Sequence, residues 1–265
     1  MSNTERLTAK QNEKIKAAVG IRDSAKMRRE TGLFFLEGAR LCADAAENNV
    51  GIVRAFFTPK ALEKYADYVQ KVSAKAKECF EITEEISSRL SDTQNPQGVF
   101  CICSSGVISA ETAGIKPDGK YIFLENVQDP SNLGAVSRTA EALGIDGLFV
   151  CGGCDIYNPK ALRASMGSAL RIPVYNCDSA VETISALNKK GMMTLASTPD
   201  SSAKLITDVD MTGGVVCVVG NEGNGVTEET MNACAMKVTI PMDGRAESLN
   251  ASTAAAILIW EMVRR

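Results

Sequence analysis

The chain has 265 residues, enough for one large domain or two domains of ordinary size. Hydrophobic residues make up 45%, charged residues 23%, and the formal net charge is −3, which is typical of a globular protein. No apolar run approaches the roughly 18 residues that indicate a membrane span. The first twenty residues lack the apolar core of a signal peptide. We therefore expect a cytoplasmic protein.

Histidine is absent from the sequence, and this excludes a whole group of mechanisms. Ser-His-Asp and Cys-His nucleophiles, and any histidine general base, are ruled out. Nine cysteines are present without regular spacing, and Cys151 and Cys154 form a single CxxC around two glycines. Since no second CxxC and no histidine accompany it, we expect a tight turn there and no metal site.

The N-terminal part alternates between short strands and helices. We predict a small α/β domain over residues 1–105, with a helical lead-in before its first strand. Residues 1–40 carry nine Lys and Arg against five Asp and Glu, a balance that fits either an RNA contact surface or an ordinary solvated helix face. The predicted strands are Leu33–Glu37, Ile52–Phe57 and Val99–Cys103, and the predicted helices are Gly38–Asn48, Lys60–Val72 and Glu84–Leu90.

A stretch rich in Ser, Gly, Pro and Ala, residues 106–119, predicts a linker to a second domain over residues 120–265. Several strands of that domain are apolar throughout, which favours a parallel sheet covered on both faces. We predict strands at Tyr121–Leu124, Gly147–Val150, Ile172–Tyr175, Met192–Ala196, Val215–Val219 and Lys237–Ile240. We predict helices at Leu133–Leu143, Lys160–Ala169, Ser179–Lys189, Thr227–Cys234 and Leu249–Val263.

Three polar segments in the second domain carry the chemistry. The first, Asn126–Gly144, is a polar strand end that leads into a helix. Asn132 is expected to cap that helix. Arg138 follows among small and apolar neighbours, where the simplest alternative is a surface arginine. A guanidinium near a helix start, beside a polar strand end, suits an anionic phosphate.

The second segment is VVGNEGNGV, residues 218–226. Its glycines let the backbone approach a ligand closely. The pattern is not GxGxxG and does not follow the first strand, which argues against a Rossmann dinucleotide site and an oxidoreductase built on it. Glu222 is the single carboxylate of this loop, and an exposed turn residue is the alternative interpretation.

The third segment, residues 240–262, runs from IPMDGRAESLNAS into an alanine-rich helix. Ser248 is expected to cap the last helix, whereas Asn250, in the expected first turn, has no obvious structural role. The alanines allow this helix to pack closely on a sheet or on a second subunit.

Together and in this order, the three segments resemble the motifs of the SpoU (TrmH) family of RNA 2′-O-ribose methyltransferases, in the SPOUT superfamily. The stretch FFLEGARLCADAAENN resembles the substrate-binding domain that often precedes that domain, similar to small ribosomal and kink-turn-binding α/β proteins. The resemblance implies an α/β-knot fold, in which a parallel sheet contains a deep trefoil knot. It also implies S-adenosylmethionine as the cofactor, a ribose 2′-hydroxyl as the acceptor, and a homodimer formed through the last helix and the Leu133–Leu143 helix.

The resemblance assigns a role to each site residue. Arg138 would hold the phosphate beside the target ribose, or act as the base once the RNA phosphate has taken its proton. Asn132, Ser248 and Asn250 would position the ribose and the arginine, and Glu222 would order the site or the cofactor loop. The residues expected to bind the cofactor are Ser197, Thr198, Gly220, Asn221, Gly225, Ile240, Met242 and Leu249.

Two alternatives stay open at this point. The extra N-terminal domain favours ribosomal RNA as the substrate, by family analogy, with tRNA as the other candidate. A non-catalytic RNA-binding protein on the same fold is the alternative to an enzyme, and the intact motif residues argue against it.

Overall fold

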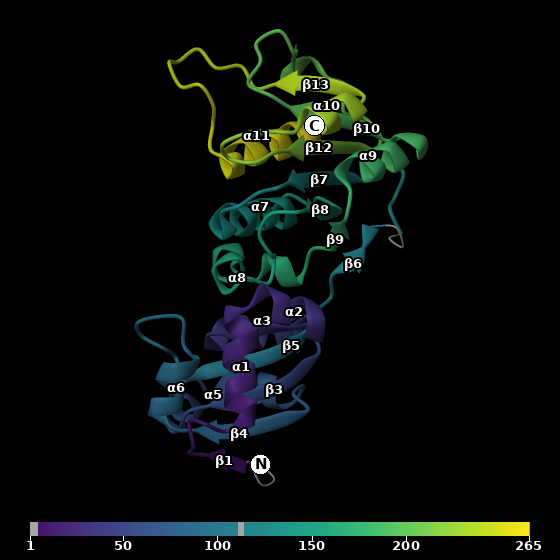
Figure 1. Ribbon diagram of the computed structural model, residues 1–265. Coiled ribbons are helices and arrows are strands. Elements are labelled where there is room, and N and C mark those ends of the chain that lie inside the picture. Colours follow the sequence, from purple (N-terminus) through teal and green to yellow (C-terminus); the bar gives the residue numbers. More distant parts are fainter. Residues whose placement is uncertain (1–4, 111–113, 265) are drawn as a thin grey trace. The chain divides into compact units, whose positions relative to one another are not determined.

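The computed structural model describes residues 5–110 and 114–264 (Figure 1). The contacts divide the chain into two compact units, each with its own sheet and core. The first comprises Met1–Gly106 and Tyr157–Leu170, and the second comprises Val107–Ile156 and Arg171–Arg265. Residues 111–113 of the predicted linker lie outside the described residues. The second domain was expected to be continuous from residue 120, but Tyr157–Leu170 groups with the first unit.

The first unit is built on a five-stranded sheet with the strand order β1-β4-β3-β5-β2. Strand β5 runs antiparallel to its neighbours β3 and β2, whereas β1, β4 and β3 pair in parallel. Apolar side chains from the sheet, α1 and α6 form one core, which includes Ile15, Phe35, Ile86 and Phe100. The strands are β1 (Glu5–Leu7), β2 (Leu33–Glu37), β3 (Ile52–Phe57), β4 (Glu78–Ile82) and β5 (Val99–Ser104). The helices are α1 (Glu13–Asp23), α2 (Ala25–Thr31), α3 (Ala39–Glu47), α4 (Pro59–Lys64), α5 (Ala66–Ser73), α6 (Glu84–Leu90), α8 (Pro159–Ser165) and the 3₁₀ turn η2 (Ser168–Leu170).

The predicted α/β character of this unit is correct, but four details differ. The helical lead-in was expected before the first strand, whereas strand β1 precedes it and pairs with β4. Strand β4 was not expected, because its sequence ECFEI carries two glutamates; in the fold, Glu78 is paired with Arg54 of the neighbouring strand at 2.8 Å. The helix expected over Lys60–Val72 is divided at Tyr65 into α4 and α5. The helix expected over Lys160–Ala169 ends at Ser165, because Met166 adopts a left-handed conformation with φ 51°.

The second unit contains an eight-stranded sheet in which every pair is parallel, with the order β11-β13-β10-β12-β7-β8-β9-β6. This confirms the predicted parallel α/β fold. The strands are β6 (Ile108–Ser109), β7 (Lys120–Glu125), β8 (Gly147–Cys151), β9 (Val174–Cys177), β10 (Met193–Ser197), β11 (Lys204–Leu205), β12 (Val215–Val219) and β13 (Met236–Thr239). The helices are α7 (Pro130–Ala142), α9 (Ala180–Lys189), α10 (Glu228–Ala233), α11 (Ala251–Val263) and the 3₁₀ turn η3 (Ile206–Asp208).

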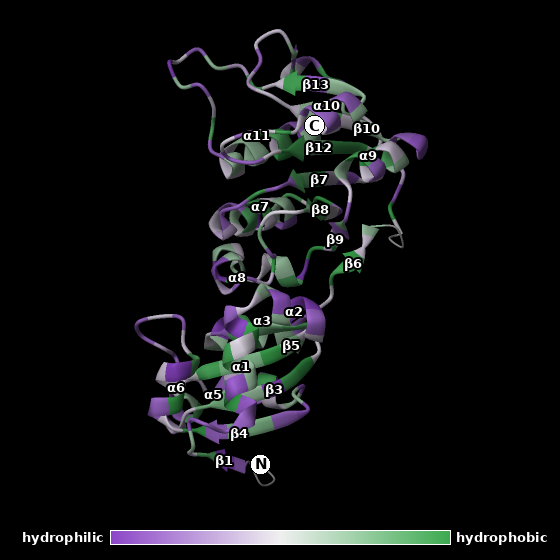
Figure 2. Ribbon diagram, in the orientation of Figure 1, coloured by the Kyte–Doolittle hydropathy of each residue, from purple (hydrophilic) through white to green (hydrophobic). Residues whose placement is uncertain are grey.

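The two faces of this sheet are covered by different helices. Side chains of α9 and α10 pack with Phe123, Phe149 and Val218 on one face. Because strand side chains alternate between faces, Ile122 and Cys217 point to the other face. There, α11 lies against α7, β7 and β12. Figure 2 shows the central strands coloured as apolar, in agreement with a sheet buried on both sides. Among the helices that the structure describes, none combines the length and the hydropathy that a membrane span requires.

Candidate active site

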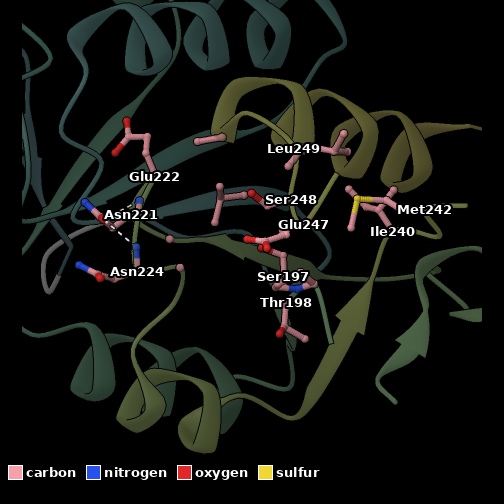
Figure 3. A pocket seen from close by; sticks show the side chains of 17 residues that line it. Ser197, Thr198, Asn221, Glu222, Asn224, Ile240, Met242, Glu247, Ser248 and Leu249 are labelled. Atoms are coloured by element: carbon pink, nitrogen blue, oxygen red, sulfur yellow. Dashed lines mark hydrogen bonds between the residues drawn. The ribbon is translucent and has the colours of Figure 1, made fainter. Parts of the chain in front are cut away.

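A cavity of about 320 Å³ lies where strands β10, β12 and β13 end (Figure 3). Carboxyl ends of parallel strands meet at one edge of a sheet, which is where open α/β sheets bind ligands. The walls come from the residues after β10, the glycine loop after β12, the segment after β13 and the first turn of α11. Four stretches of chain that are far apart in sequence therefore meet at one pocket.

The glycine loop after β12 is closed by two backbone hydrogen bonds between Asn221 and Gly225, of 3.0 and 2.9 Å. The Asn221 side-chain oxygen also accepts from the backbone N–H groups of Gly223 and Asn224. A Cβ atom on buried Gly220 would lie 2.0 Å from the carbonyl carbon of Gly225. Residue 220 must therefore be glycine for the loop to close in this way.

Glu222 points away from the loop toward the start of α7. Its Oε1 accepts from the Asn132 side chain at 2.9 Å and from the Asp129 N–H at 3.1 Å, and its Oε2 accepts from the Gln128 N–H at 3.0 Å. Desolvation raises the pKa of the Glu222 carboxyl, but these hydrogen bonds outweigh it and hold the pKa below its ordinary value. Glu222 is thus an ionised acceptor that joins two loops, and a poor general base.

A second hydrogen bond extends this contact to the last helix. The Asn132 oxygen accepts from the Asn250 side-chain amide at 3.1 Å. The Asn250 oxygen in turn accepts from the backbone of Ser252 and Thr253 at the start of α11. The three motif segments are therefore linked by one chain of hydrogen bonds, Glu222–Asn132–Asn250.

Both predicted helix caps are wrong, for related reasons. Asp129, not Asn132, caps α7, and Pro130 takes the first helical position, which leaves Asn132 inside the first turn with its side chain directed to Glu222. Asn250, not Ser248, caps α11, so the helix starts at Ala251, two residues later than expected. Ser248 is exposed and lines the cavity instead.

Arg138 takes no part in the Glu222–Asn132–Asn250 chain of hydrogen bonds. It lies on α7, six residues after Asn132, which places it on a different face of the helix. The side chain is exposed, and no hydrogen bond or ion pair to another described residue holds it. Its guanidinium is therefore available to a ligand.

The residues predicted to bind a cofactor are gathered at one place. All of them line the cavity: Ser197, Thr198, Gly220, Asn221, Gly225, Ile240, Met242 and Leu249. Figure 3 shows Ile240, Met242 and Leu249 at one end of it and the loop residues Asn221 and Asn224 at the other. The cavity thus has an apolar end and a polar end.

Two carboxylates of this region were not predicted from the sequence. Glu125 ends β7 and is 3% exposed; it accepts from the Thr227 N–H and hydroxyl and, at 2.6 Å, from the Thr230 hydroxyl. It thereby fixes the segment that leaves the glycine loop. A signal was available, since Glu125 is a charge at the end of an apolar strand. Glu247 lines the cavity and stands in the sequence directly before Ser248.

The CxxC motif forms the tight turn that was expected. Gly152 and Gly153 have positive φ values of 65° and 72°, and the Cys154 N–H donates to the Val127 carbonyl at 2.8 Å. All nine cysteines are free. Within the described part of the chain, no group of His, Cys, Asp and Glu is arranged to hold a metal ion.

The fold and these motif contacts define a known family. A model of the SpoU rRNA Methylase family matches residues 119–260, and a model of the MRM3-like substrate binding domain matches residues 12–101. The chain belongs to the SpoU rRNA methylase family, and the predicted resemblance is confirmed.

Individual relatives match along nearly their whole length. The chain is 30% identical to the 23S rRNA (guanosine(2553)-2′-O)-methyltransferase RlmP of Bacillus subtilis, over 89% of this chain and 91% of that protein. It is 27% identical to an uncharacterized tRNA/rRNA methyltransferase of Synechocystis, over 100% of this chain and 95% of the relative. Among solved structures, an AdoMet-bound rRNA methyltransferase from Sinorhizobium meliloti superposes with a TM-score of 0.87 at 26% identity, covering 98% and 97% of the two chains.

Proposed function

We propose that this protein transfers a methyl group from S-adenosylmethionine to a ribose 2′-hydroxyl in ribosomal RNA. One observation carries the proposal: the eight predicted cofactor residues line a single cavity, and the Glu222–Asn132–Asn250 chain lies beside it. The relatives support the substrate class, because RlmP is named as a 23S rRNA 2′-O-methyltransferase. They favour ribosomal RNA over tRNA.

The residues around the cavity fit the cofactor. Ile240, Met242 and Leu249 offer an apolar wall for an adenine ring, and Gly220, which has no side chain, lets the Gly225 backbone close the loop beside them. Glu222 and Glu247 are the charged residues among the described lining, and their sign suits a cation. When bound, S-adenosylmethionine supplies an electrophilic methyl group on a positively charged sulfonium.

The protein's own residues then have to position a weak nucleophile. We assign Asn132 and Asn250 to the ordering of the loops around the ribose, Glu222 to holding Asn132, and Ser248 to a contact with the ribose from the cavity rim. Arg138 binds the phosphate next to the target ribose and so orients its hydroxyl. We do not assign it as the base, because a guanidinium is not deprotonated in proteins.

The proposal extends to the fold and the assembly. We propose that the segment after β13 is threaded as the trefoil knot of the family, and that residues 12–101 bind RNA as a substrate-binding domain. We also propose a homodimer through α7 and α11, supported by the exposed face of α11, where Trp260 is 55% exposed. A cytoplasmic location remains part of the proposal.

The test of function is binding followed by transfer. Calorimetry with S-adenosylmethionine should show one site per chain, and the enzyme should move a labelled methyl group to ribosomal RNA from cells that lack the gene. Mapping 2′-O-methylated nucleotides in that RNA would then identify the position. If the protein neither binds S-adenosylmethionine nor transfers the methyl group, the alternative of a non-catalytic RNA-binding protein is favoured.

The role of Arg138 is tested by Arg138→Ala. Loss of a charge-assisted phosphate contact should lower transfer by roughly 100-fold, while the affinity for S-adenosylmethionine changes less than twofold. Lys189→Ala, at the exposed end of α9, is the control and should behave as wild type. Retained transfer in Arg138→Ala would remove this residue from the mechanism.

The dimer is tested by light scattering at micromolar concentration. Trp260→Glu should convert a dimer into a monomer, because it places a charge on the proposed contact. A wild-type protein that is monomeric under these conditions would contradict the proposed assembly.

A further inference from the structure

The charged residues that line the cavity are all acidic. Of the 17 described residues that line it, two are glutamates and none is a lysine or arginine. A ligand that enters this cavity therefore meets negative charge with no basic side chain of the lining to balance it.

The two glutamates differ in the hydrogen bonds that their carboxylates make. Both carboxylate oxygens of Glu222 already accept hydrogen bonds, from Asn132, Gln128 and Asp129. Glu247, by contrast, makes no hydrogen bond or ion pair within residues 5–110 and 114–264. In Figure 3 its side chain points into the pocket that Ser197 and Ser248 also line. Of the two lining carboxylates, Glu247 is therefore the one that has no partner among the described residues and can interact with a ligand.

We infer that Glu247 is a specificity-determining residue that makes the cavity hold the methyl-loaded cofactor more tightly than the demethylated product. This inference rests on the proposed function. S-adenosylmethionine carries a positive sulfonium, whereas S-adenosylhomocysteine has a neutral thioether in its place. The two molecules share the adenosine and the amino-acid tail, so a carboxylate near the sulfur distinguishes them by charge alone. The consequence is easier release of the spent cofactor.

The expected size follows from Coulomb's law. The attraction between two opposite unit charges about 4 Å apart in a water-exposed site raises the affinity by a factor of roughly five. Glu247 is exposed, so the interaction should also weaken as the ionic strength rises.

The experiment measures dissociation constants by calorimetry for both S-adenosylmethionine and S-adenosylhomocysteine, at low and high salt. Glu247→Gln should weaken S-adenosylmethionine binding by roughly fivefold and leave S-adenosylhomocysteine within twofold. Glu247→Asp, which keeps the charge, should retain most of the preference. Asp243→Asn is the matched control, because it removes a charge from the same segment at a residue that does not line the cavity.

The outcomes separate this inference from the function on which it rests. If Glu247→Gln weakens both ligands equally, the carboxylate contacts the shared amino-acid tail and the inference is wrong. It is equally wrong if the ratio of the two affinities is unchanged, or changes as much in Asp243→Asn. If the wild-type protein binds neither molecule, the proposed function itself fails.

Discussion

Glu37 and Glu222, one in each unit, are carboxylates that each accept three hydrogen bonds but connect different parts of the fold: Glu37 ends β2, and Glu222 lies in the loop after β12. Glu37, at the end of β2, accepts from the Ser91 hydroxyl at 2.5 Å, the Asp92 N–H at 2.9 Å and the Thr93 hydroxyl at 2.7 Å. Glu222 likewise accepts three hydrogen bonds. Both are carboxylates that organise a loop at a sheet edge.

The difference lies in what each carboxylate connects. All the donors to Glu37 come from one loop, so its effect ends there. Glu222 connects its own glycine loop to the start of α7, and Asn132 carries the connection on to Asn250 at the start of α11. Only this second arrangement adjoins the described cavity. A site is therefore indicated less by the carboxylate itself than by polar contacts that join segments which each carry a motif.

The largest effect is expected at the glycine that lets the loop close. In Gly220→Ala the new Cβ meets the Gly225 backbone at 2.0 Å, so the loop has to move out of its present position. We expect a loss of S-adenosylmethionine affinity of roughly 100-fold and a loss of stability of about 1–3 kcal/mol. Calorimetry and urea unfolding would measure the two effects.

The matched control for that change is Gly223→Ala. A Cβ at residue 223 meets nothing closer than the Asn221 side-chain oxygen, at 3.5 Å. It should leave affinity and stability nearly unchanged. Equal effects of the two substitutions would mean that the closed loop is not what the cavity requires.

The two carboxylates themselves give the next largest effect. Replacing either by glutamine removes one acceptor and should cost about 1 kcal/mol of stability. Glu222→Gln should in addition lower methyl transfer by about tenfold, because a hydrogen bond to a charged group is lost beside the cavity. Glu37→Gln should not alter S-adenosylmethionine affinity. If Glu37→Gln weakens cofactor binding as much as Glu222→Gln does, the contrast between the two carboxylates does not hold.

Much of the architecture was predictable, because apolar strands are strong signals. Leu33–Glu37, Ile52–Phe57 and Val215–Val219 were predicted with their observed bounds. Two of the failures have identifiable causes. Strand β4 contains glutamates, one of which pairs with Arg54 of the neighbouring strand, and α8 ends early because Met166 adopts a left-handed conformation. Neither a partner strand nor a φ value can be read from local sequence.

The site was predictable as a set of residues but not as a set of contacts. The motif segments indicated Asn132, Glu222 and Asn250, and the fold joins them. Local sequence could not identify Asp129 and Asn250 as the helix caps, since Asp, Asn and Ser are about equally good at that position. Glu125 was missed because its partners, Thr227 and Thr230, are more than one hundred residues away.

The smallest expected effect is the pH dependence that the Glu222 hydrogen bonds confer. The pKa of Glu222 is lowered from its ordinary value of 4.5, so the unfolded chain takes up a proton at a higher pH than the folded one does. The stabilisation is therefore fully present above about pH 4.5 and is lost as the pH falls through the lower folded value. Because the side chain is largely exposed, the stabilisation that depends on pH should amount to a few tenths of a kcal/mol.

Other carboxylates titrate in the same range, so the measurement is the difference in unfolding free energy between wild type and Glu222→Gln, from pH 7 down to pH 3. That difference should be constant down to about pH 5 and shrink below it; a constant difference across the whole range would show that the hydrogen bonds from Asn132 and the α7 backbone do not favour the ionised form.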